Sequence, residues 1–119
     1  MGTGIDLRLL SDRRKKMTET ALNNLVTAAK LRLRLKTNAF DEEVKDLINA
    51  AAMDLLKRNA VQEAQLNEDP LDPLILRAIM TFVRANFGEP ENPERLKADY
   101  DEQKATLMMT SGYTVWEES

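Results

Sequence analysis

Carboxylates are the most abundant side chains in this sequence that could carry out acid–base or metal chemistry. The chain of 119 residues has 20 Asp and Glu but no cysteine and no histidine. That composition excludes disulfides, thiolate nucleophiles, Cys/His zinc sites and every histidine-based triad or proton shuttle. The acidic residues Asp99, Asp101 and Glu102 lie close together in sequence. On a helix, however, residues two positions apart point in different directions, which favours a solvated face over a site.

A second acidic group is equally well explained without catalysis. Glu42, Glu43 and Asp46 fall where a helix is predicted to begin, and negative charge is stabilising at the positive end of the helix dipole. The sequence also contains no glycine-rich phosphate loop ending in Lys-Ser or Lys-Thr. We therefore predict a protein that is not an enzyme, with no cofactor, no metal and no catalytic residue.

Basic side chains form the next candidate group, and their partner would be DNA or an acidic protein surface. Four basic residues alternate with leucines: Lys30, Arg32, Arg34 and Lys36. On a helix they would point in different directions around the axis, so they form no single face that could contact the bases of DNA. They are candidates for DNA-channel or charge-complementary contacts. The alternative is a structural one, in which their stems pack over leucines while the charges stay in water. A net charge of −3 also disfavours tight duplex binding.

Aromatic and methionine side chains near the C-terminus suggest a protein interface. Tyr113 and Trp116 follow the last predicted helix, and aromatic side chains are enriched at interfaces because they bury a large area at low entropic cost. Met108 and Met109 belong to the same patch, because flexible thioethers suit an adaptable surface. Phe87 is the remaining candidate for this interface with a partner or a second subunit. Alternatively, the aromatic residues fold back over the core of their own domain.

The elements that would position these residues are all helices. Apolar spacing predicts helices from Thr18 or Thr20 to about residue 35, from Asp41 to about residue 58, over 74–87, and from Pro93 to about residue 109. Asp41 is the predicted N-cap of the second helix, and Asp72-Pro73 is a cap and first-turn pair before the third. Residues 60–72 form a connection that can add one helical turn. We predict an all-α fold, a small four-helix bundle with short extra turns and an extended C-terminal tail. Gly112 is predicted to end the last helix.

The third predicted helix is apolar on nearly every side. Such a helix is either the central element of a core or also meets a partner subunit. Replacing Ile79, in its middle, by Asp should therefore unfold the subunit, because a buried charge would lack a partner.

The domain boundaries follow from composition. Residues 1–16 contain the like-charge block Arg13-Arg14-Lys15-Lys16 and two glycines, which predicts a disordered leader or an extension upstream of a native start at Met17. A basic arm that touches DNA is the alternative. Residues 17–112 form the helical domain, and residues 113–119 form a C-terminal arm.

Charge is unevenly distributed along the chain. Residues 1–58 carry a net charge of +4 and residues 59–119 a net charge of −7. Opposite charge on two parts of one subunit suits head-to-tail association of identical copies, although ordinary solvated helix faces would give the same pattern. There is no run of eighteen apolar residues and no signal peptide pattern, so we expect no membrane association and synthesis in the cytoplasm.

Two stretches of the sequence resemble a known family. The first comprises Leu25–Leu35, a short polar break and Asp41–Ala51; the second comprises Ile79–Gly88, Pro90, Arg95-Leu96, Tyr100–Lys104 and Thr110–Thr114. Together they resemble phage head–tail connector proteins, also called head–tail adaptor or DNA-packaging proteins. The resemblance extends over about residues 20–116, and residues 1–16 depart from the family pattern.

The resemblance implies a structural protein of the virion, located at the head–tail junction and made in the cytoplasm of a bacterial host. Family members form a homo-oligomeric ring, twelvefold to match the portal protein, which extends the DNA channel and docks the next head-completion or tail-proximal protein. DNA would pass through the channel without specific recognition. The C-terminal segment, here Tyr113 to Trp116, would contact the portal, so Trp116→Ala should weaken docking without changing thermal unfolding. The alternative function is that of a small helical DNA-binding protein, either a packaging subunit or a regulator.

Overall fold

The computed structural model describes the backbone of residues 17–118 and the side chains of residues 17–110. The helices are α2 (Glu19–Leu33), α3 (Asp41–Lys57), α4 (Glu63–Leu66), α5 (Pro73–Asn86) and α6 (Pro93–Glu118). No strand occurs between residues 17 and 118, so the all-α prediction is confirmed. The leader prediction for residues 1–16 lies outside the described residues.

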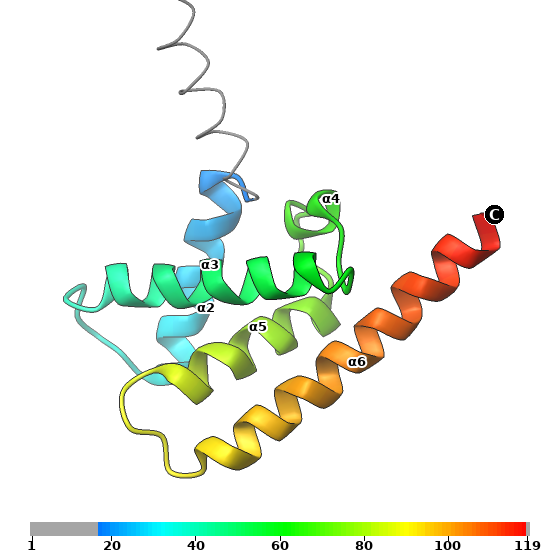
Figure 1. Ribbon diagram of the computed structural model, residues 1–119. Helices are drawn as coiled ribbons and strands as arrows, with labels where there is room; N and C mark the ends of the chain where they lie inside the picture. The colour runs from blue at the N-terminus through cyan, green and yellow to red at the C-terminus, as the bar shows by residue number, and fades with distance from the viewer. Residues whose placement is uncertain (1–16, 119) are drawn as a thin grey trace, which may run out of the picture.

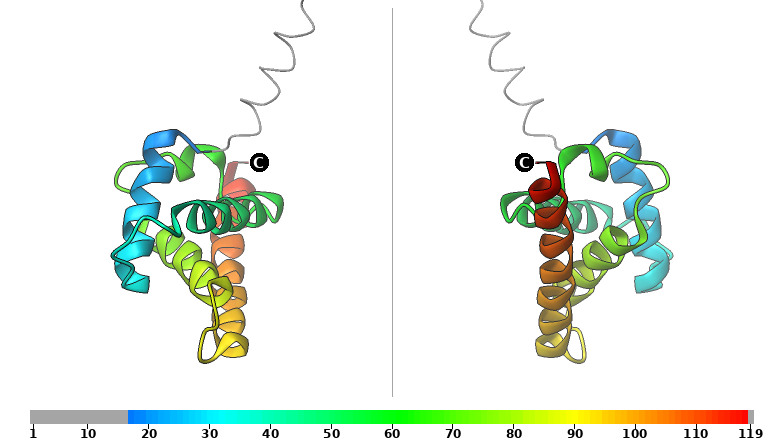
Figure 2. Two further views of the ribbon diagram at one scale, coloured as in Figure 1. Left: turned by 90° about the vertical axis from the view of Figure 1, so that its left-hand side faces the viewer. Right: turned by 90° about the vertical axis from the view of Figure 1, so that its right-hand side faces the viewer.

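Helix α5 is the central element of the fold. It packs against α2, α3 and α6, which surround it on different sides (Figures 1 and 2). Ile79, in its middle, has no exposed surface, and Ile75, Ala78 and Val83 are almost fully buried. The apolar composition predicted for this segment therefore reflects a position at the centre of the core.

Helix α2 begins and ends with its own capping contacts. The Thr18 hydroxyl accepts a hydrogen bond from the Ala21 amide at 3.1 Å, which identifies Thr18 as the N-cap. The helix ends at Leu33, and Arg34 adopts a left-handed conformation with φ of 60°. The alternating Leu/Arg segment is thus a helix end, as predicted, and contains no strand.

Helix α3 confirms the predicted apolar stripe but begins differently. Val44, Ile48, Ala51 and Leu55 are buried against the core. Phe40 is the N-cap and makes no side-chain capping bond, while Asp41, which we predicted as the cap, is the first helical residue. Its carboxylate lies 2.9 Å from the Lys30 ammonium of α2, so the charge pairs across two helices instead of capping one.

The connection from α3 to α5 contains the predicted extra turn. This turn is α4, whose Leu66 side chain is fully buried, and the Gln65 side chain accepts a hydrogen bond from the Gln62 amide. Helix α5 then starts with Pro73, and the Asp72 carboxylate caps it by accepting a hydrogen bond from the Leu74 amide at 2.8 Å. Gly88, just after the end of α5, has a φ of +58°, a conformation in which glycine has no side-chain penalty.

Helix α6 corrects one prediction. We expected it to end near Met109 and be followed by an extended tail, but it runs through Gly112 to Glu118. A glycine inside a helix costs about 1 kcal/mol relative to alanine and does not remove a hydrogen bond, and no proline follows it. The strand-type residues after Gly112 differ from good helix formers by only a few tenths of a kcal/mol each, so helix propagation prevails.

Candidate interaction surfaces

The second half of α6 extends beyond the helix on which the first half packs. Helix α5 has 14 residues and α6 has 26, lengths of about 21 and 39 Å at 1.5 Å per residue. The two helices run antiparallel from a shared loop, so α6 continues past the start of α5, as Figure 1 shows. We call residues 108–118 the projecting segment.

Exposed methionines mark the start of the projecting segment. The side chain of Leu107 is 7% exposed, whereas Met108 is 41% and Met109 76% exposed. Both methionines were predicted interface residues, and the structure places them on the surface. Tyr113 and Trp116 lie on the helical backbone of this segment, but their side chains are outside the described part of the chain. Positions 109, 113 and 116 have the i, i+4, i+7 spacing of one helix face.

A polar cluster fixes the first half of α6 against α3. The Tyr100 hydroxyl donates a hydrogen bond to Asp54 Oδ2 at 2.6 Å, and the Lys104 ammonium lies 2.9 Å from the same oxygen. The Phe82 ring of α5 packs edge-on against Tyr100, with centroids 5.2 Å apart. Tyr100 itself is 5% exposed. The cluster therefore joins three helices and sets the direction in which α6 leaves the core.

The electrostatics of the cluster keep Asp54 charged. Burial of the Asp54 carboxylate would raise its pKa. The hydrogen bonds from Tyr100 and Lys104 and the charges of Lys104 and Arg58 outweigh this, so the pKa falls below its ordinary value of 3.8. The pKa of Tyr100 is raised well above its ordinary value of 10.0, first by burial and then by its hydrogen bond to the Asp54 carboxylate. A neutral hydroxyl thus donates to a charged acceptor, a strong type of hydrogen bond.

Sequence reasoning missed this cluster because its members lie far apart in the chain. Asp54 and Tyr100 are separated by 46 residues. In the helical pattern Asp54 lies outside the apolar stripe of α3. An acidic residue in such a position is expected to face solvent. Only the crossing of α3 and α6 brings the two side chains together.

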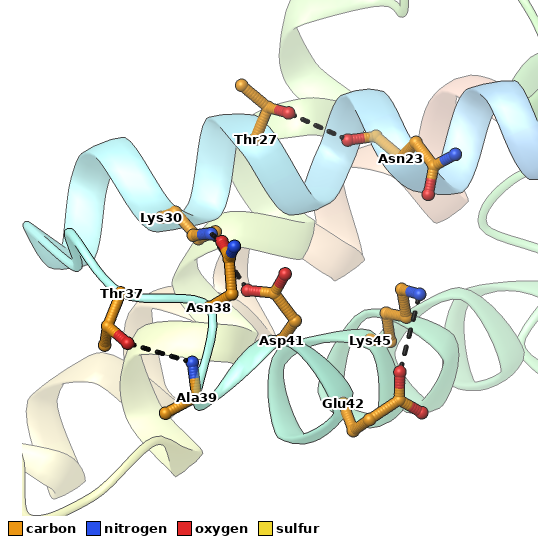
Figure 3. A network of polar contacts seen from close by, with 9 residues as sticks. All are labelled: Asn23, Thr27, Lys30, Thr37, Asn38, Ala39, Asp41, Glu42 and Lys45. Carbon is orange, nitrogen blue, oxygen red and sulfur yellow. Dashed lines mark hydrogen bonds and ion pairs between the residues drawn. The ribbon is translucent and has the colours of Figure 1, made fainter.

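The four predicted basic residues do not form one group. Lys30 is turned toward α3, where its ammonium lies 2.6 Å from Asn38 Oδ1 and 2.9 Å from Asp41 (Figure 3). Arg32, Arg34 and Lys36 are exposed. The Arg32 guanidinium donates a hydrogen bond to the Ala28 carbonyl at 3.4 Å, and Arg34 caps the helix through its backbone amide. Lys30 thus stabilises the α2–α3 junction, and the other three remain at the surface.

Phe87 also has an intramolecular partner. Its ring is half-buried against the core and packs edge-on against Phe40, with centroids 5.7 Å apart. The Phe40 side chain, at the start of α3, is the more exposed of the pair. This pair closes the end of the bundle where α5 finishes and α3 begins.

Comparison with known proteins identifies the family of the chain. A family model described as "Phage connector protein" matches residues 25–114. The chain belongs to the phage connector family. The matched region runs from the first turns of α2 into the projecting segment, so the family region includes both halves of α6. No curated protein and no solved structure matches the chain.

Family membership gives the chain a structural connector role in a phage particle. Among the side chains of residues 17–110, no cluster of three or more acidic, histidine or cysteine residues could hold a metal ion. Asp99, Asp101 and Glu102 thus form no such cluster. None of the described helices is long and apolar enough to cross a membrane.

Proposed function

We propose that the chain is a subunit of a ring at the head–tail junction, which extends the DNA channel below the portal protein and docks the next tail-proximal protein. The observation that carries this proposal is the projecting segment. A family member that connects other proteins is expected to present apolar surface to them, and here two exposed methionines begin the part of α6 that extends past the start of α5.

The length of α6 supports an arm that works between molecules. About four turns of α6 are enough to pack along α5 and reach the cluster around Asp54. The three turns that follow would be marginal as an isolated helix, because short helices in water lack tertiary packing. A portal surface or a neighbouring copy would supply that packing. The role is mechanical, and we assign the chain no reaction and no cofactor.

Net charge and placement of the basic residues favour a channel role over specific DNA binding. The alternative, a small helical DNA-binding protein, would need several basic side chains on one reading face. Here Lys30 pairs with Asp41, and of the other three only Arg32 lies within α2, with Arg34 at its C-cap and Lys36 beyond it. Exposed Arg34 and Lys36 suit transient contacts with passing phosphates.

The test is cosedimentation of the subunit with the purified portal ring of the same phage. We expect wild-type protein to bind the ring and Met109→Asp to weaken binding at least tenfold, which corresponds to about 1.4 kcal/mol. Met53→Asp is the matched control, because Met53 is an exposed methionine on α3 and not on the projecting segment. Both variants should keep wild-type thermal unfolding.

Two results would overturn the proposal. If wild-type subunit neither binds the portal nor associates with itself, the chain is not a connector of this type. If instead it binds a short DNA duplex with strong salt dependence and ignores the portal, the alternative function holds.

A further inference from the structure

The surface formed by α2, α5 and the start of α6 contains a hollow lined by arginines. It has a volume of about 570 Å³, and three arginines from three different helices line it: Arg32, Arg84 and Arg95. Leu33, Phe87 and Leu96 form apolar parts of its wall. We call this surface the arginine hollow. Because it combines cationic heads with apolar wall, it suits a partner segment that is both acidic and apolar.

Two carboxylates share the hollow with its three arginines. Glu91 and Asp99 also line it, yet none of the three arginines makes an ion pair with another described residue. All three side chains are exposed. Arg34 and Lys36, just after Arg32 in the chain, are exposed as well and add positive charge at this end of the molecule.

The complementary surface lies at the other end of the same subunit. Residues 59–76 contain four carboxylates and no lysine or arginine. Glu68 and Asp69 in this segment are exposed and, within the described residues, take part in no ion pair. They lie at the rim of a second hollow of about 460 Å³, whose wall includes Leu25, Leu66 and Leu71. We call this surface the acidic rim.

The acidic rim is held in a fixed position. Leu66, next to it, is fully buried, and the Asn67 side chain accepts a hydrogen bond from the Thr18 amide at 2.7 Å. A surface whose backbone is already positioned loses less conformational entropy on binding. Its charges can therefore orient a partner efficiently.

The two surfaces are lined by different parts of the bundle. The first turns of α2 and the α4–α5 connection line the hollow with the acidic rim, whereas the end of α2, the end of α5 and the start of α6 line the arginine hollow. In Figure 1, α4 is at the top, whereas the end of α2 and the α5–α6 loop are at the bottom. Both views of Figure 2 show the same separation. No residue lines both hollows, so one copy can offer the two surfaces to two different neighbours.

We infer that the arginine hollow of one copy binds the acidic rim of the next copy in a head-to-tail contact. This inference rests on the proposed ring and specifies which surfaces hold neighbouring subunits together. Complementary charge would set the register and speed of association, and the apolar walls would add buried surface.

Disulfide trapping tests the contact directly, because the chain has no native cysteine. The double variant Asp69→Cys/Arg84→Cys, oxidised with copper phenanthroline, should form a ladder of linked trimers and larger species on a non-reducing gel. Glu68, Arg32 and Arg95 remain to guide the contact. Added salt should slow ladder formation, because it screens exposed charges.

Two controls test whether the cross-linked ladder comes from contact between the two proposed surfaces. The double variant Asp69→Cys/Asn49→Cys carries its second cysteine at an exposed position on α3, outside the arginine hollow, and should form no species above dimers. A mixture of the single variants Asp69→Cys and Arg84→Cys should yield heterodimers in excess of either homodimer, because the contact joins two different surfaces.

The inference fails if the 69/84 variant gives no trimers or if the 69/49 variant gives an equal ladder. A second failure is also possible. If the wild-type protein binds a short DNA duplex, Arg84→Glu abolishes that binding, and the 69/84 variant forms no ladder, the arginine hollow is a nucleic-acid surface. These failures leave portal binding of the wild-type protein untouched. Loss of portal binding with an intact ladder would instead count against the proposed docking function.

Discussion

The two halves of helix α6, before and after Leu107, differ in what surrounds them. From Pro93 to Leu107 it packs along α5 and is joined to α3 through Tyr100 and Lys104. From Met108 onward the same helix continues with exposed methionines. The first half therefore contributes to the stability of the subunit, and the second half can be devoted to a partner. Under the proposed function, this single helix would separate folding from assembly, with the boundary at Leu107.

Ile79→Asp should have the largest effect, because it removes the core that the first half of α6 packs on. A carboxylate at a fully buried position with no cationic partner should cost more than about 4 kcal/mol and unfold the subunit, as measured by circular dichroism. Leu74→Asp on the same helix is the control. Leu74 is exposed near the start of α5, so we expect a change within about 0.5 kcal/mol. A folded Ile79→Asp subunit would contradict the central position of α5.

Tyr100→Phe should lower the free energy of unfolding by about 2 kcal/mol, because the variant loses a hydrogen bond to a charged acceptor in the first half of α6. Urea denaturation measures the change. Tyr113→Phe, in the projecting segment, is the matched control and should leave stability unchanged. Equal losses in both variants would remove the distinction between the two halves.

Acid should weaken the same contact. Because the pKa of Asp54 in the folded protein lies below 3.8, its stabilising effect is present above that pH and is lost as the pH falls through the folded value. Asp54→Asn should therefore be less stable than wild type by about 1 kcal/mol at neutral pH. The difference should shrink below pH 3.8. Urea midpoints measured across this range check the sign, and a difference independent of pH would show that the charge of Asp54 does not matter.

Much of this fold could be predicted from the sequence because it depends on local patterns. The apolar stripe of α3 and the proline at the start of α5 each depend on residues within one short segment of the chain. Both predictions are confirmed. The end of α6 was predicted wrongly, because Gly112 is a strong local stop signal but only a modest energetic cost inside a helix.

The interaction surfaces were harder to predict. Met108 and Met109 could be assigned to the surface from composition and position. The Asp54–Tyr100 contact, the pairing of Lys30 with Asp41 and the arginine hollow all depend on how the helices cross. Each joins residues from different helices, and no local pattern indicates which side chains meet.

Hydrogen–deuterium exchange of the free subunit and of its complex with the portal ring tests the central claim most directly. In the free subunit, amides of the projecting segment should exchange faster than those between residues 97 and 107, because the segment extends past the start of α5. In the complex they should become protected, while the first half of α6 changes little. Strong protection of residues 108–118 in a free monomeric subunit, or unchanged exchange on portal binding, would contradict the assignment of this segment to assembly.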